Sequence, residues 1–332
     1  MDEVGFYHIK RLADERHDGG YNIKVVQHKG DELHTFINNT MMRVDLPEPL
    51  EPGDEFEFFI KWNYNIQDQV RYGGRSGYEY FEENDNYLFE IAQWFPRMCK
   101  YDDVYGWQNK QFLGRGEFAL PFGDYEVEIT VPADHMVMAT GDLTNKKEVL
   151  TSTQLERLEK AYESFEEPVV IVTEEEAMEN EKEKAKDTKT WKFEAERVRD
   201  FAFASSRKFL WDAMGVKIGD RTVLAQSLYP KEGLPLWGMY STRVVAHTLK
   251  TYSKYTIDYP YPHCASIHGP VWGMEYPMMT FNGGRPNPEG EYPLRIKYAN
   301  ISVIIHEVGH NFFPMIINSD ERQWTWMDEG LN

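Results

Sequence analysis

Residues 301–332 read ISVIIHEVGHNFFPMIINSDERQWTWMDEGLN and contain the pattern HExxH, from His306 to His310. On an α-helix, residues four positions apart lie on one face about one turn apart, so two imidazoles at this spacing can bind one metal ion. The residues around the pattern are apolar, which is typical of a buried helix that holds its ligands rigidly. The stretch therefore predicts a metal-binding helix in the interior of the protein.

Two carboxylates extend this pattern. Glu307 points away from the face of the two histidines, so we expect it to reach a metal-activated water and to accept its proton as a general base. Glu329 follows His310 after 18 intervening residues, and a second short helix carrying it could fold back to supply a third ligand. Two histidines, one glutamate and an open position are typical of catalytic zinc. The sequence thus predicts one Zn²⁺ per chain, although HExxH by itself also fits an ordinary helix with two histidines.

The combination of HExxH, the 18-residue gap and the glutamate within WMDEGLN resembles peptidase family M1, the aminopeptidase N and leukotriene-hydrolase group of gluzincins. Residues 272–277, WGMEYP, resemble the Gly-x-Met-Glu-Asn motif that precedes the zinc helix in that family. The stretches at 92–98 and 106–135 look similar to a bacterial branch of the family. The resemblance therefore covers most of the chain.

This resemblance implies roles for residues of the second motif. Glu275 would bind the free α-amino group of a peptide substrate, with Gly273 and Met274 beside it in the substrate-binding motif. Trp272 and Tyr276 replace the glycine and asparagine of the family motif. We expect the two larger side chains to reshape the pocket for the substrate's amino end.

The resemblance also implies an activity and a length. The expected activity is that of a zinc-dependent aminopeptidase, which hydrolyses the first bond of peptides with a free N-terminus. A zinc endopeptidase, a non-catalytic scaffold and an epoxide hydrolase side activity are the alternatives. The family is longer at both ends, so the chain resembles a fragment. A tyrosine that stabilises the oxyanion would lie beyond Asn332, and we expect the fragment itself to be weak or inactive.

Composition excludes several other classes of protein. The chain has 332 residues and a net charge of −19, and no concentrated basic face is evident, which argues against binding of nucleic acid. Cys99 and Cys264 are too few and too distant in sequence for a disulfide framework; one bridge between them is conceivable, but we expect two free, buried thiols. No run of about 18 apolar residues predicts a transmembrane helix. The start, MDEVGFYHIK, does not resemble a signal peptide. A cytoplasmic or an exported location and any oligomeric state stay open.

The hydrophobic pattern divides the chain into two predicted parts. Alternating apolar residues at 56–66 and 125–131 indicate strands, and a partial N-terminal β domain, a sheet saddle or sandwich, is expected over 1–206. A charged helical insertion is predicted at about 151–187 within it. A helix is predicted at 238–256, and residues 207–332 are expected to form a truncated thermolysin-like catalytic domain. The predicted fold class is α+β.

Overall fold

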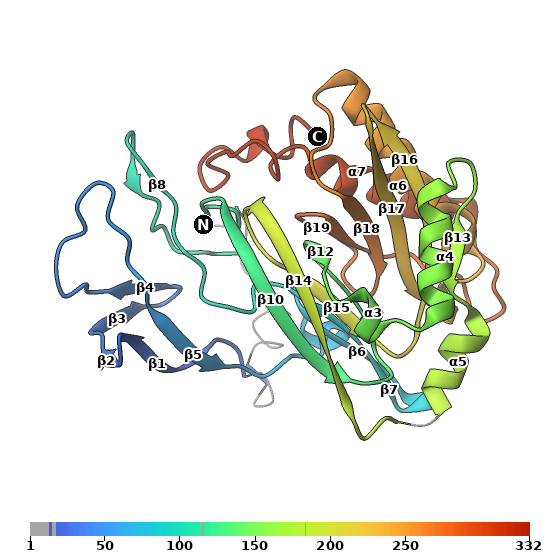
Figure 1. Cartoon of the computed structure of the whole chain (residues 1–332), viewed down its shortest axis with the longest axis horizontal. Helices are drawn as coiled ribbons and strands as arrows, with labels where there is room; N and C mark the ends of the chain where they lie inside the picture. Colours follow the sequence, from blue (N-terminus) through green and yellow to red (C-terminus); the bar gives the residue numbers. More distant parts are fainter. Residues whose placement is uncertain (1–12, 15–17, 115, 183) are drawn as a thin grey trace.

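A computed structural model describes residues 13–14, 18–114, 116–182 and 184–332 (Figure 1). The fold of these residues is mixed and rich in sheet, with helices gathered on the C-terminal half of the chain. The segment MDEVGFYHIK, on which the signal-peptide prediction rests, lies outside the described residues. Within the described part, no helix has the length and apolar character needed to cross a membrane.

The first strands form small sheets at one end of the molecule (Figure 1). One sheet has the order β2-β1-β5, and β3-β4 and β8-β9 are separate two-stranded hairpins. Their bounds are β1 (Asn22–His28), β2 (Asp31–Glu32), β3 (Thr35–Asn38), β4 (Met41–Val44), β5 (Phe59–Asn63), β8 (Tyr101–Asp102) and β9 (Gly106–Trp107), with the short helix α2 (Gln69–Tyr72) after β5.

Two larger sheets occupy the middle of the molecule. Their strand orders are β11-β15-β7-β6 and β10-β14-β12. The elements are β6 (Gly77–Phe81), η1 (Glu82–Asn84), β7 (Asn86–Ile91), β10 (Gly123–Pro132), β11 (Met136–Ala139), β12 (Asp142–Leu143), α3 (Lys146–Val149), β14 (Thr188–Val198) and β15 (Phe203–Ser206). All the pairings in both sheets are antiparallel.

The two strands predicted from alternation differ in outcome. β10 confirms the prediction at 125–131, because its apolar residues turn inward and its polar residues stay exposed. The strand predicted at 56–66 is wrong in length, since β5 covers only Phe59–Asn63. β5 pairs with β1 alone, and Phe59 is half exposed, so the alternating residues beyond β5 lack a partner strand and a covered face.

A six-stranded sheet carries the C-terminal half, in the order β13-β16-β17-β18-β20-β19. β18 runs parallel to its neighbours β17 and β20, and the other pairs are antiparallel. Its elements and the helices around it are α4 (Ser152–Glu163), β13 (Val169–Val172), α5 (Glu174–Lys182), β16 (Phe209–Ile218), β17 (Arg221–Pro230), η2 (Lys231–Gly233), α6 (Leu236–Tyr255), β18 (His263–His268), β19 (Gly273–Tyr276), β20 (Met279–Asn282), α7 (Leu294–His310) and η3 (Thr325–Met327).

Helices cover this sheet on both faces. Successive residues of a strand point to opposite sides. Accordingly, Ala213 of β16 belongs to a buried cluster with Leu158 of α4. The next residue, Met214, belongs to a second cluster with Val245 of α6. Because helices bury both faces, β16 and β17 read as nearly continuous apolar runs rather than alternating ones.

The stretch predicted as a charged helical insertion, 151–187, does contain the helices α4 and α5. It does not stand apart from the rest, however, because β13 between them pairs with β16 and forms one edge of the six-stranded sheet. The short apolar run Val169–Val172 supplies this strand, and α4 packs over it. The division into domains near residue 206 stays a prediction.

Two further predictions are confirmed. The helix expected at 238–256 is α6, Leu236–Tyr255. Cys99 and Cys264 are both free thiols as expected, but the expected burial holds only for Cys264, because Cys99 is partly exposed.

Candidate metal centre

The two histidines of HExxH lie in the last turns of α7, which ends at His310. The helix is held in place by its apolar side. Ile304 and Val308 are fully buried in the cluster shared with α6, and α7 also packs against β19 and β20. With that face fixed against the sheet and α6, His306 and His310 share another face and lie close together, with their ring centroids 4.5 Å apart.

The residues after α7, 311–332, form a return segment that brings Glu329 back to the helix face that carries the two histidines. Buried Arg199 donates to the carbonyl oxygen of Pro314 at 3.0 Å, and Glu321 accepts from the backbone N–H of Phe118 at 3.3 Å. Met315 is fully buried between these anchors. The expected helix around Glu329 is wrong in detail, because η3 ends at Met327 and Glu329 lies in the turn that follows it.

The three predicted ligands meet at one point. Nε2 of His306 lies 3.1 Å from Nε2 of His310, and Oε2 of Glu329 lies 3.3 Å and 3.6 Å from these nitrogens. Tetrahedral zinc with bonds of about 2.0–2.1 Å places its ligand atoms about 3.3 Å apart. Two imidazole nitrogens and one carboxylate oxygen are also ligand types that zinc prefers. The residues therefore fit this metal in both chemistry and spacing.

A second acidic group lies on the buried side of His310. Ligand atoms of Glu275, Glu307 and His310 are all within 4.8 Å of one another. Glu275 comes from β19, the edge strand of the six-stranded sheet, and Glu307 comes from α7. Gly273 makes this approach possible, since a Cβ atom there would collide with Oε1 of Glu307 and lie 2.8 Å from Cγ2 of Val303.

The alternation of β19 separates the predicted substrate-binding residues. Gly273 and Glu275 face α7, whereas Met274 and Tyr276 belong to the buried cluster on the other side of the strand. The Met274 side chain is therefore turned away from Glu307, and only its backbone is available to a ligand. Trp272 is half exposed at the start of the strand.

Burial sets the protonation of the two acids near α7. It raises the pKa of Glu307 to about 7, against the lowering effect of nearby His310. Burial also raises the pKa of Glu275 well above its usual range, and the charges of Glu307 and Glu117 add to this. Both carboxyls are therefore poised to hold a proton near neutral pH.

The pKa values of the ligands move differently. The hydrogen bond with His310 lowers the pKa of Glu329, so this carboxylate stays ionised. Burial disfavours the charged form of His310, but the close carboxylates of Asp328 and Glu329 outweigh it and raise its pKa to about 12. A proton thus sits in the metal-free site among the atoms that would otherwise bind a cation.

Sequence reasoning missed two charged residues beside the site. Asp328 is buried, and its Oδ1 lies 2.7 Å from Nδ1 of His310. Glu117 is also buried, and Nε of Arg75 lies 3.0 Å from its Oε1. Asp328 could have been noticed as the acid next to a ligand. Glu117 lies in the stretch GRGEF, within the segment 106–135 that resembles the family, but that resemblance assigned this residue no role.

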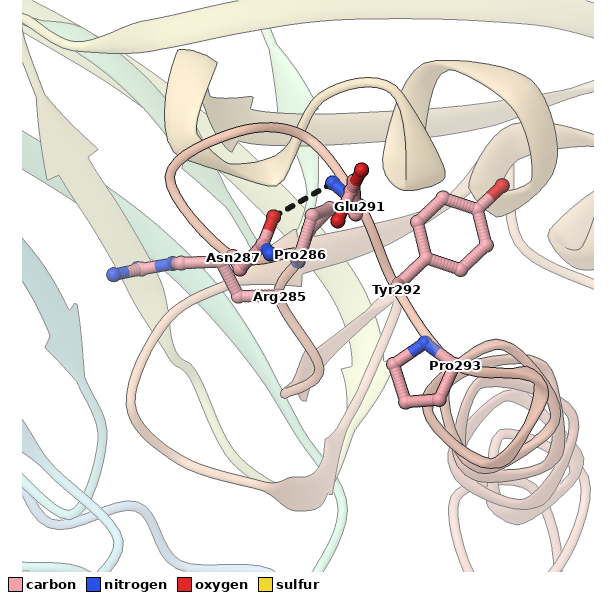
Figure 2. Close-up of a pocket in the computed structure, with 6 residues that line it drawn as sticks. All are labelled: Arg285, Pro286, Asn287, Glu291, Tyr292 and Pro293. Atoms are coloured by element: carbon pink, nitrogen blue, oxygen red, sulfur yellow. Dashed lines mark hydrogen bonds between the residues drawn. The ribbon is translucent and has the colours of Figure 1, made fainter.

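A separate hollow of about 550 Å³ lies in the loop between β20 and α7 (Figure 2). Figure 2 shows its lining from Arg285 to Pro293, in which the backbone N–H of Glu291 donates to the Asn287 side chain at 2.7 Å. The hollow adjoins the first turn of α7, about 18 Å along the helix axis from His306. None of the predicted site residues lines it.

Comparison with known proteins finds similarity in fold but none in sequence. No family model and no curated protein matches the sequence. Solved structures do match the fold. An M1 zinc metallopeptidase from Deinococcus radiodurans aligns with a TM-score of 0.56 at 17% identity, covering 94% of this chain and 58% of that one. A two-domain M1 zinc metallopeptidase mutant bound to L-arginine gives a TM-score of 0.55 at 16% identity, covering 94% of this chain and 59% of the other.

A third solved structure, a mutant of the Deinococcus radiodurans enzyme bound to a Tyr-Ser-Ala substrate, has a TM-score of 0.52 at 15% identity, with coverage of 94% and 59%. The chain thus spans 58–59% of the length of these three solved chains. At such low identity the likeness establishes a shared fold. A shared fold does not fix the activity, which depends on the residues of the site.

Proposed function

We propose that this chain carries the catalytic site of a zinc-dependent aminopeptidase of peptidase family M1. One observation carries the proposal: the ligand atoms of His306, His310 and Glu329 lie 3.1–3.6 Å apart, with the buried carboxyl of Glu307 beside them. Three protein ligands leave a position for water or substrate, which is the arrangement of catalytic rather than structural zinc.

When bound, zinc supplies Lewis acidity, which acidifies water and polarises a peptide carbonyl. The protein supplies the proton transfer. With a pKa near 7, the Glu307 carboxylate can take a proton from the attacking water and give it to the leaving amine. Its burial beside His310 also keeps the carboxylate close to the reacting atoms.

Glu275 favours an aminopeptidase over an endopeptidase. Its carboxyl is buried next to Glu307, where it can pair with the α-ammonium of a peptide and fix the first peptide bond at the metal. Because β19 lies at the edge of its sheet, it also offers backbone groups to an extended peptide. Among the similar structures, one is bound to L-arginine and another to a Tyr-Ser-Ala substrate.

The test begins with the metal. Zinc content of the purified chain is measured by mass spectrometry for wild type, His310→Ala and the control His247→Ala, which removes an exposed histidine from α6. We expect about one zinc per chain in wild type and the control, and almost none in His310→Ala. Wild-type chain without zinc, under conditions where it is folded, would contradict the proposed centre.

Substrate class is tested next with matched peptides. A peptide with a free N-terminus and its N-acetyl form are incubated with the zinc-loaded chain, and the cleavage products are identified by mass. Release of the first residue from the free peptide alone supports the aminopeptidase. Cleavage of the acetylated peptide would indicate an endopeptidase, and a zinc-loaded chain that binds neither peptide would indicate a scaffold.

A further inference from the structure

The buried carboxylate of Asp328 contacts the back of His310. Its Oδ1 lies 2.7 Å from Nδ1 of His310, and the two side chains are only 6% and 1% exposed. The hydrogen bond of Nδ1 goes to the carbonyl oxygen of Phe313 at 2.9 Å, so Oδ1 of Asp328 makes a close ion-pair contact with the ring and, among the described residues, receives no hydrogen bond. A buried carboxylate with a single partner depends strongly on that partner, because an unpaired one is costly.

The contact of Asp328 with Nδ1 matters because the position of the ring proton decides whether Nε2 of His310 can bind a metal. A neutral imidazole carries its proton on one nitrogen only, and Nε2 can bind a metal only if the proton lies on Nδ1. In His310, Nε2 faces His306 and Glu329, whereas Nδ1 faces the carbonyl oxygen of Phe313 at 2.9 Å and Asp328. Both of these neighbours of Nδ1 are acceptors, so they favour the metal-binding tautomer.

The two acceptors differ in strength and in origin. The carbonyl of Phe313 lies three residues after His310 and accompanies the end of α7. Asp328 comes from the return segment and directly precedes Glu329. A carboxylate is the stronger acceptor, since charge-assisted hydrogen bonds are about twice as strong as neutral ones. Its contact with Nδ1 also depends on the return segment that places Glu329 at the metal site.

We propose that Asp328 is a positioning residue that orients His310 for zinc and joins the folding of the return segment to assembly of the centre. The proposal rests on the metal centre of the proposed function. In the zinc-loaded centre, the Asp328 carboxylate would accept a hydrogen bond from Nδ1–H, fix the plane of the ring and make Nε2 a better electron-pair donor to the metal. Loss of such an outer contact typically weakens metal binding 10- to 100-fold.

The experiment measures zinc affinity by competition with a chromophoric chelator, without reference to hydrolysis. Asp328→Ala is compared with wild type and with Asp320→Ala, a control from the same return segment whose carboxylate contacts Gln323 rather than a metal ligand. We expect about 10- to 100-fold weaker zinc binding for Asp328→Ala and wild-type affinity for the control. Equal affinity for Asp328→Ala and wild type would overturn the proposal, because the Phe313 carbonyl would then suffice.

Two further measurements separate positioning from general stability. The melting temperature of each metal-free chain shows whether a variant is folded, and the absorption spectrum of bound Co²⁺ reports the ligand geometry. Asp328→Asn keeps the shape and one acceptor oxygen, so its zinc affinity should lie between wild type and Asp328→Ala, with a shifted Co²⁺ spectrum. If Asp328→Ala does not fold, a wild-type affinity and spectrum for Asp328→Asn would refute the proposal. Wild-type chain that binds no zinc would instead refute the proposed function.

Discussion

The two sides of His310 present carboxylates in opposite environments. On the outer side, Glu329 is 56% exposed, and its pKa is lowered mainly by its hydrogen bond with His310. On the inner side, Glu307 is 6% exposed, and burial raises its pKa to about 7. The two residues are of one chemical type and lie close to the same imidazole.

This difference assigns their roles. A metal ligand must stay ionised, which suits Glu329, whereas a general base must exchange a proton near the working pH, which suits Glu307. The backbone enforces the split. Glu307 is directed inward by α7, whose buried face it shares, and Glu329 arrives from the solvent side on the return segment.

The largest expected effect comes from exchanging each carboxylate for an amide. Glu307→Gln should reduce hydrolysis by about 10²–10⁴-fold, the usual contribution of a general base, and leave zinc affinity unchanged. Glu329→Gln should instead weaken zinc binding, because an amide is a poor zinc ligand. Paired measurements of peptide hydrolysis and zinc affinity check both variants. If Glu307→Gln also lost the metal, the assigned roles would be wrong.

The next effect is on stability in the absence of metal. A carboxyl whose pKa is raised on folding stabilises the protein when protonated, and this contribution is lost as pH rises from about 4.5 through the folded pKa of Glu307, about 7. Since one pKa unit corresponds to about 1.4 kcal/mol, the full change is about 3 kcal/mol.

Glu307→Gln mimics the protonated acid, so the metal-free variant should match wild type at pH 4 and become progressively more stable than wild type between pH 5 and 8. Thermal unfolding of both chains in the presence of a chelator checks this. Subtracting the stability of wild type from that of Glu307→Gln at each pH cancels the contribution of distant titrating groups, which both chains share. A stability difference independent of pH would show that Glu307 is not protonated on folding.

A smaller effect is expected at Glu275, the second inner carboxylate. Glu275→Ala should weaken binding of a peptide with a free N-terminus by about 10- to 100-fold, since a hydrogen bond to a charged group contributes about 1.5–3 kcal/mol. Binding of the N-acetyl form should change little. Calorimetry with both peptides on zinc-loaded Glu307→Gln, with and without Glu275→Ala, gives the comparison without turnover. Equal losses for both peptides would argue against an amine-binding role.

Sequence patterns predicted those parts of the site that depend on local spacing. The register of a helix fixes His306, Glu307 and His310 relative to one another, and the structure places all three on α7 as expected. Glu329 could be proposed only from its distance along the chain and the family resemblance. The structure brings it to the two histidines through anchors that are far apart in sequence, such as Arg199 and Pro314.

The features that the sequence did not predict correctly all depend on tertiary contacts. The prediction of a strand at 56–66 followed alternation, but only Phe59–Asn63 finds a partner strand. β13 escaped prediction because a four-residue apolar run between two charged helices carries no periodicity. The contact of Asp328 with His310 has the same origin, since it depends on how the return segment folds back.

The smallest expected effect comes from Gly273 and tests whether tight packing on the inner side of His310 fixes the position of Glu307. A Cβ atom at Gly273 would lie 2.8 Å from Cγ2 of Val303 and collide with Glu307, so Gly273→Ala must displace the general base. Because small displacements of a catalytic group lower rates steeply, we expect hydrolysis to fall on the order of tenfold while zinc affinity is retained. The matched control is Gly123→Ala in β10, where the added methyl would make only an ordinary contact, at 3.9 Å from the Tyr125 ring. Hydrolysis and zinc affinity measured side by side distinguish the outcomes. If Gly273→Ala hydrolyses peptides as fast as Gly123→Ala, Glu307 does not depend on this close approach of β19 for its position.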